Sequence, residues 1–350
     1  MSGRAREDDR GSDAEAAAER GAPVVFERDC LRILRDRRGG VVRYAEVTHI
    51  AVSPRVVAIG TLRDTIVLRR REFADESAMR AFERALRNRI ARLPGGDARI
   101  ARMAELDQLA RTRGPRRAVY GFIAVCALVF ALQWRDPFST HLGSFMPSLV
   151  ADGELWRIVT ANFLHDLVIF PIHLGLNLLC IAVVGLLVER VLGSWRTVVV
   201  MGFSAAGAML GCALAGYTST VGASGVAAGL VGALLCIELN GSRRLPVVWR
   251  IPRRILFGAL IAQAALDYFV PFIAGAAHLG GFLAGYAVTR LLVADSLLRR
   301  PVGPLARAAA GVALAGVVAS AIAIAPLLVR QQAALERHAL RLLQLSLIHI

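Results

Sequence analysis

Two short polar motifs stand at the start of apolar segments and hold residues that could hydrolyse a peptide bond. Ser224 lies in Gly-Ala-Ser-Gly, residues 222–225, and His278 lies in Ala-Ala-His-Leu-Gly-Gly, residues 276–281. A serine hydroxyl is a weak nucleophile until a neighbouring imidazole accepts its proton. Polar groups at bilayer depth are costly and usually face a bundle interior or a water-filled cavity. The pair therefore favours a nucleophile and a base inside a membrane.

A second pair of polar residues could stabilise the oxyanion that forms when a carbonyl is attacked. His173 and Asn177 are four residues apart, so on a helix they share one face. Their N–H groups, together with the backbone N–H of Ser224, are the candidate oxyanion donors. We find no acid well placed to orient His278. Asp267 is the nearest, and we expect it to be a packing or gate residue, so the hypothesis is a Ser–His dyad.

Seven apolar segments must position these residues. Each has, or nearly has, the length that a helix needs to cross about 30 Å of hydrocarbon. They cover residues 118–134, 171–189, 197–217, 224–239, 255–273, 276–294 and 308–329. Small residues after Ser224 and after His278 should let the fourth and sixth spans approach closely.

Arginine placement predicts the orientation of these spans. Arginines gather before the first span and after the second, fourth and sixth, whereas the other side has only Arg135 and Arg157 before the seventh. Because short cytoplasmic loops are rich in basic residues, we expect a cytoplasmic N-terminus and an outside C-terminus.

This orientation gives the candidate residues a common depth. His173, Ser224 and His278 lie in the first few residues of the second, fourth and sixth spans, which all run from outside to inside. Taken alone, each motif also fits a packing serine or a histidine in a proton relay. Agreement among three separate segments favours a shared site just below the outer surface, where water can enter.

The composition fits a membrane protein with basic flanks. The 350 residues are 55% hydrophobic, the mean hydropathy is +0.52, and the formal net charge is +15 with no lysine. The arginines gather before residue 118 and in alternate loops between the spans, which argues against nucleic-acid binding. Abundant Arg, Ala, Gly and Val point to a GC-rich bacterial genome and hence to the bacterial inner membrane. The five cysteines show no metal-binding spacing, so we expect no disulfide, metal or cofactor.

The ends of the chain are expected to lie outside the membrane core. Residues 1–23 are charged and should be a disordered tail. Residues 24–95 alternate apolar and polar positions and close with one helix, which resembles small pleckstrin-homology-like modules. This pattern predicts a soluble cytoplasmic head, and we expect it to bind an unknown partner. Residues 96–117 are expected to be a linker, residues 295–329 a loop and the extra span, and residues 330–350 a tail. The last six match a translated sequencing adapter, so we expect a scar and set His349 aside.

Residues 118–294 resemble the rhomboid intramembrane serine proteases. The matching motifs occur in order: Glu-Leu-Trp-Arg at 154–157, Phe-Leu-His at 163–165, His173-x-x-x-Asn177, Gly185-x-x-x-Glu189, Gly-Ala-Ser-Gly at 222–225, and Ala277-His278-x-x-Gly281-x-x-x-Gly285. The stretch between His165 and His173 is longer than in compact bacterial members, which leaves that loop's geometry open.

The resemblance implies an all-α polytopic membrane protein with a six-helix core, here with a seventh helix and a small, mainly β head. It implies Ser224 as nucleophile, His278 as general base, and His173, Asn177 and the Ser224 backbone N–H as oxyanion donors. Trp156 and Arg157 would lie in a membrane-embedded loop, and the substrates would be single-pass membrane proteins in the bilayer. Two alternatives stay open: a non-catalytic rhomboid-like protein that binds transmembrane clients, and a transporter.

Overall fold

The structure is a computed structural model of the 350-residue chain. It describes residues 24–34, 40–62, 64–112, 114–167, 172–241, 244–270, 273–293 and 302–348, with side chains as far as residue 330. The predicted tail, residues 1–23, lies outside the described residues. The chain divides into two compact units: residues 1–113 with 241–259, and residues 114–240 with 260–350.

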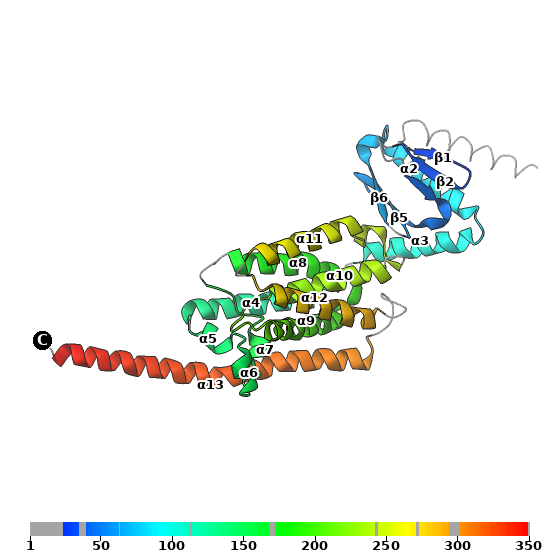
Figure 1. Cartoon of the computed structure of the whole chain (residues 1–350). Coiled ribbons are helices and arrows are strands. Elements are labelled where there is room, and N and C mark those ends of the chain that lie inside the picture. Colours follow the sequence, from blue (N-terminus) through cyan, green and yellow to red (C-terminus); the bar gives the residue numbers. More distant parts are fainter. Residues whose placement is uncertain are drawn as a thin grey trace, which may run out of the picture. The chain divides into compact units, whose positions relative to one another are not determined.

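The first unit is built on two antiparallel sheets, as the alternating pattern predicts (Figure 1). One sheet contains β1 (Val24–Phe26), β2 (Cys30–Ile33) and β3 (Val41–Arg43), and the other contains β4 (Val47–Val52), β5 (Val56–Thr61) and β6 (Thr65–Arg69). Inward-facing side chains such as Leu31, Ile50 and Ile59 are fully buried. Burial of these alternate positions against the helices holds the sheets in register.

Two helices, and not one, complete this unit. The predicted helix is α2 (Glu76–Ala91), whose first turn is capped by the Asp75 side chain accepting from the Ala78 N–H. A second helix, α3 (Gly96–Arg111), occupies most of the expected linker. Met103 and Leu106 on α3 are 1% exposed, and Met103 belongs to the same core as the strands. The prediction of a linker at 96–117 was therefore wrong over α3, because this charged helix buries Met103 and Leu106 and its Asp107 pairs with His49 and Arg87.

The first unit also contains residues 241–259, which we call the connector. The connector follows α10 and includes the short 3-10 helix η4 (Val247–Trp249) and the start of α11 (Arg253–Phe269). Leu245, Val247 and Trp249 of the connector are buried, and η4 packs against β4 and β5. The division between the two units falls within α11, which is one continuous helix.

The second unit is helical. Its long helices are α4 (Arg117–Arg135), α8 (Ile172–Leu192), α9 (Ser194–Leu214), α10 (Ser224–Asn240), α12 (Gly275–Leu292) and α13 (Pro304–Ile348), together with the last part of α11. Three short helices, α5 (Ser139–Gly143), α6 (Pro147–Ala151) and α7 (Arg157–Thr160), lie between α4 and α8. In Figure 1, α9, α10 and α12 lie side by side, and they are the most extensively packed elements.

The helices account for the expected spans in part. Four described helical segments are long and apolar enough to cross a membrane: Arg117–Arg135, Ile172–Leu192, Ser194–Leu214 and Pro304–Arg330. Ser224–Asn240 is apolar but shorter. The chain is thus a multi-pass, mostly helical membrane protein with a small β head, while the count of seven spans stays a prediction. The fifth and sixth expected spans correspond to α11 and α12, which have 17 and 18 residues.

Glycines let α12 approach α10 and α9 until their backbones touch. A Cβ atom added to Gly281 would collide with the backbone of Gly225, and one added to Gly285 would collide with that of Gly229. Gly207 of α9 and Gly280 of α12 meet in the same way. The predicted close approach of the small-residue faces is confirmed.

Glu189 explains one of the sequence motifs as a structural element. Its carboxylate accepts hydrogen bonds from the backbone N–H groups of Ala118 and Val119 at 2.9 and 3.0 Å, and from the Ser194 hydroxyl at 2.6 Å. It thereby satisfies donors at the start of α4 that have no partner within their own helix. Gly185, one turn earlier, lets Val119 pack closely against α8.

Candidate active site

Ser224 is the first residue of α10, and the turn before it depends on glycine. Gly222 has φ +129°, a conformation that L side chains rarely adopt. Its N–H donates to the Ala161 carbonyl at 2.9 Å, which ties the turn to the segment after α7. The serine is therefore presented at a helix start by a turn that is fixed on both sides.

His173 lies beside this turn. A Cβ atom placed on Gly222 would be 3.1 Å from His173 Nε2 and 3.8 Å from Ser224 Oγ, so Gly222 leaves open the space between the two side chains. The Asp166 backbone N–H donates to His173 Nδ1 at 3.2 Å. Because Nδ1 accepts, the proton of the neutral ring is on Nε2. The imidazole therefore directs an N–H donor toward the space next to Ser224.

Asn177 is on the same helix as His173 and is 6% exposed. Its Nδ2 donates to the His173 carbonyl at 2.9 Å. One of the two amide hydrogens is thus used within α8. The structure confirms that His173 and Asn177 share a helix, one turn apart.

His278 has a carboxylate partner, which corrects the sequence analysis. His278 Nδ1 lies 2.7 Å from Asp267 Oδ1, and Gln263 Nε2 donates to the same oxygen at 2.7 Å. The expectation that no acid is placed to orient His278 was wrong, because the break between α11 and α12 returns the chain so that the end of α11 faces the start of α12. Gln263 and Asp267 are polar, lie four residues apart, and interrupt the apolar stretch that follows Arg254 on α11. That spacing was the signal in the sequence for a shared site.

The packing of α10 on α12 brings the Ser224 and His278 segments together. A Cβ atom on Gly225 would lie 3.4 Å from the Ala277 carbonyl oxygen, so the residues next to Ser224 and His278 are in contact. Among the described residues, no hydrogen bond joins the two side chains themselves. Catalytic hydrogen bonds are often long in the absence of substrate.

The first loop is held together by Arg157, which is 3% exposed. Its guanidinium donates to the carbonyls of His141 and Ser144 at 2.8 Å each and to Glu154 Oε2 at 2.6 Å. The Trp156 indole donates to the Leu142 carbonyl at 3.3 Å. Trp156 and Arg157 therefore fasten the loop that carries α5, α6 and α7.

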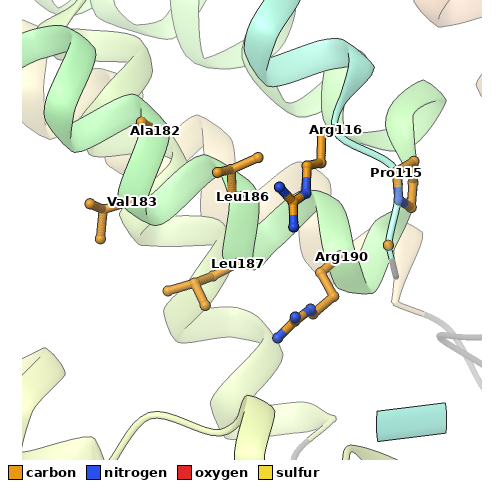
Figure 2. Close-up of a pocket in the computed structure, with 8 residues that line it drawn as sticks. Pro115, Arg116, Ala182, Val183, Leu186, Leu187 and Arg190 are labelled. Atoms are coloured by element: carbon orange, nitrogen blue, oxygen red, sulfur yellow. The ribbon is translucent and has the colours of Figure 1, made fainter. Parts of the chain in front are cut away.

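Figure 2 shows a cavity of about 340 Å³ between the start of α4 and the second half of α8. Arg116 and Arg190 line it together with apolar residues that include Val183 and Leu186. The lining contains no nucleophile, and none of the candidate catalytic residues belongs to it. We therefore place the candidate chemistry at Ser224 and not in this cavity.

A match to a known family covers the segment that holds all four candidate residues. The family model described as the rhomboid domain matches residues 152–295. Residues 152–295 of this chain therefore form a rhomboid domain. Rhomboid protease GluP of Bacillus subtilis (strain 168) is 33% identical to the chain over 174 residues, which are 48% of this chain and 33% of the Bacillus protein.

Two further relatives match a similar share of this chain. Rhomboid-like protease 3 of Toxoplasma gondii is 30% identical over 48% of this chain and 63% of its own length. Rhomboid protease AarA of Providencia stuartii is 27% identical over 46% of this chain and 65% of its own length. The chain spans less than two thirds of each of these three relatives. The range that the family model matches, residues 152–295, lies in the helical part of the chain.

Proposed function

We propose that this protein is an intramembrane serine endopeptidase that cleaves transmembrane segments of other membrane proteins. The observation that carries the proposal is that the side chains of Ser224 and His173 both border the space left open at Gly222, within a domain whose relatives are named as proteases. A nucleophile next to an N–H donor is the arrangement that acyl transfer requires.

In the proposed reaction, Ser224 Oγ attacks the substrate carbonyl while His278 Nε2 accepts the hydroxyl proton. The oxyanion that forms accepts hydrogen bonds from His173 Nε2–H, the Ser224 backbone N–H and the remaining amide hydrogen of Asn177. His278 then protonates the leaving amine, and an acyl group stays on Ser224. Water, deprotonated by His278, attacks this acyl group and releases the second product and the free serine.

The arginine distribution supports a location for this reaction. With the N-terminus in the cytoplasm of a bacterium, the starts of α8, α10 and α12 face the outer side of the inner membrane. Water can reach that depth without crossing the bilayer. Single-pass substrates would enter from the lipid beside α11, and the head would remain in the cytoplasm.

The test uses the full chain reconstituted in lipid vesicles with a single-pass model substrate and a fluorophosphonate probe. We expect the wild type to cleave the substrate and to carry the probe on Ser224, and Ser224→Ala to lose both while keeping its thermal stability. A wild type that binds the substrate without cleaving it or reacting with the probe would instead indicate a client-binding protein. Cleavage that persists in Ser224→Ala would also reject the proposal.

A further inference from the structure

The contact between His278 and Asp267 determines which ring nitrogen of His278 can act as a base. His278 Nδ1 lies 2.7 Å from Asp267 Oδ1 and 3.2 Å from Gln263 Nε2, which itself donates to Asp267 Oδ1 at 2.7 Å. Because a carboxylate only accepts hydrogen bonds, the shorter contact makes Nδ1 the donor to Asp267. Nε2 of the neutral ring is then unprotonated. That nitrogen is the one the proposed reaction needs as proton acceptor.

The carboxylate itself is held in place. Asp267 is 18% and His278 11% exposed at the side chain, and Gln263 Nε2 donates to Asp267 Oδ1 from one turn earlier on α11. Gly275, three residues before His278, packs on Asp267, since a Cβ atom there would lie 3.0 Å from Asp267 Cβ. A largely covered carboxylate is costly without hydrogen-bond partners, so its alignment with His278 is well determined.

We propose that Asp267 positions His278 for catalysis, with Gln263 positioning Asp267. This inference rests on the proposed function and adds a third member to the Ser–His pair. Asp267 fixes the tautomer of His278 and stabilises the imidazolium that forms when Ser224 gives up its proton. Asp267 touches no substrate atom, so its loss should lower kcat and leave KM nearly unchanged.

The test compares Asp267→Asn, Asp267→Ala and Asp267→Glu with Tyr268→Phe, a matched control at an exposed neighbour on α11. We expect Asp267→Asn to lower kcat by about 10²- to 10⁴-fold, because an amide can donate to Nδ1 and favour the wrong tautomer. Asp267→Glu should recover part of the loss. The rate at which the fluorophosphonate probe labels Ser224 should fall in parallel. Because the probe has no transmembrane segment, this rate reports the reactivity of Ser224 and not the binding of the substrate.

A nitrogen NMR spectrum of the histidine-labelled protein gives a readout separate from activity. His278 should show a protonated Nδ1 in the wild type and lose this signature in Asp267→Asn, a nearly isosteric change that should preserve the fold. An unchanged kcat and tautomer in Asp267→Asn, with a cleaving wild type, would overturn the role of Asp267. A wild type without Ser224-dependent cleavage would overturn the proposed function instead.

A second inference comes from a separate observation, the attachment of the connector to the head. His49 on β4 is fully buried; its Nδ1 accepts from the Val247 backbone N–H at 2.9 Å, and its Nε2 lies 3.0 Å from Asp107 Oδ1. Arg250 donates to the Thr61 carbonyl at 2.9 Å. Both contacts join residues nearly 200 positions apart within one compact unit.

The two bonds of His49 require its neutral form. Nε2 carries the proton that goes to Asp107, and Nδ1 must be unprotonated to accept from Val247. The charged groups around the ring are Asp107 on α3, which also pairs with Arg87 on α2, and Glu83, which pairs with Arg87. Arg250 is the charged connector residue nearby, and its guanidinium is directed to Thr61.

We infer that the head is an acid-sensitive clamp on the connector. Protonation of Nδ1 replaces an acceptor with a donor that faces the Val247 N–H, so the connector must leave. The connector joins the helix that starts with Ser224 to the helix that carries Asp267. Release of the connector would therefore free the segment of chain that links these two helices.

The direction of the pH effect follows from burial. Burial lowers the pKa of His49 below its ordinary value of 6.5, and the Asp107 carboxylate opposes this only in part. The attached form therefore binds the proton more weakly than the released form. Attachment is strongest above pH 6.5 and weakens as the pH falls from 6.5 toward the lowered pKa.

The test is hydrogen exchange of the Val247 amide in the full chain, corrected for the pH dependence of intrinsic exchange. We expect protection to fall by up to about tenfold from pH 8 to pH 5.5, which is the loss of roughly one hydrogen bond. His49→Ala should lack protection at both pH values, while His49→Asn, which keeps an acceptor near Nδ1, should remove only the pH dependence. Arg32→Ala, at an exposed ion pair of the head, is the matched control. An equal pH response in His49→Asn and the wild type would refute the clamp.

Discussion

Replacing His278 with alanine is expected to lower the cleavage rate by at least about 10³-fold, because Ser224 then has no base to accept its proton. The effect should appear in kcat, since His278 takes no part in binding the transmembrane segment. Vesicle-reconstituted protein and a quantified model substrate measure it directly.

The double variant Ser224→Ala/His278→Ala sharpens this result. Groups that act as one unit are strongly non-additive, so the double variant should be about as slow as either single variant. A loss in the double variant equal to the product of the two single losses would mean that the residues act separately. Full activity in His278→Ala would remove His278 from the mechanism.

Replacing Gly281 with alanine is expected to have the second-largest effect. The added methyl group would collide with the backbone of Gly225, next to Ser224. A side chain could relieve such a collision by changing its rotamer, but a backbone cannot. Overpacking of this kind costs about 1–3 kcal/mol of stability. Because a displacement of about 1 Å at reacting groups can cost about 100-fold in rate, we expect activity to fall more than stability.

The matched control is Gly121→Ala on α4, where an added Cβ atom has no neighbour within 4 Å. It should leave both the melting temperature and the cleavage rate close to those of the wild type. Equal behaviour of the two variants would show that the contact between α10 and α12 tolerates expansion.

Much of the candidate site could be predicted from the sequence, because the patterns that mark it are local. Ser224 lies between glycines at a helix start, and His173 precedes Asn177 by one turn, so residue type and spacing alone gave their places. The small residues after Ser224 and His278 likewise predicted close helix packing. Each of these features depends on neighbours within a few residues.

The features that were missed depend on contacts between distant segments. Asp267 reaches His278 only because of the angle at which the chain returns after α11, and spacing does not determine that angle. Val247 and His49 are 198 residues apart, and no periodicity connects them. The helix α3 was not predicted for another reason. It has many charged residues and buries only two apolar side chains fully, so its sequence shows no clear helical pattern of apolar positions.

The light packing of α11 has a kinetic consequence. Leu256 is the one buried residue of this fully described helix, and Ile261, Tyr268 and Phe269 are more than two-thirds exposed to the surroundings. Little apolar contact with protein opposes a sideways movement of such a helix. Such a movement would carry Asp267 away from His278 and leave the imidazole free to adopt either tautomer. In the proposed enzyme, the fraction of time that α11 is in place would then set the upper limit of the turnover number, and a substrate that displaces this helix on entry would delay its own cleavage until the helix returns.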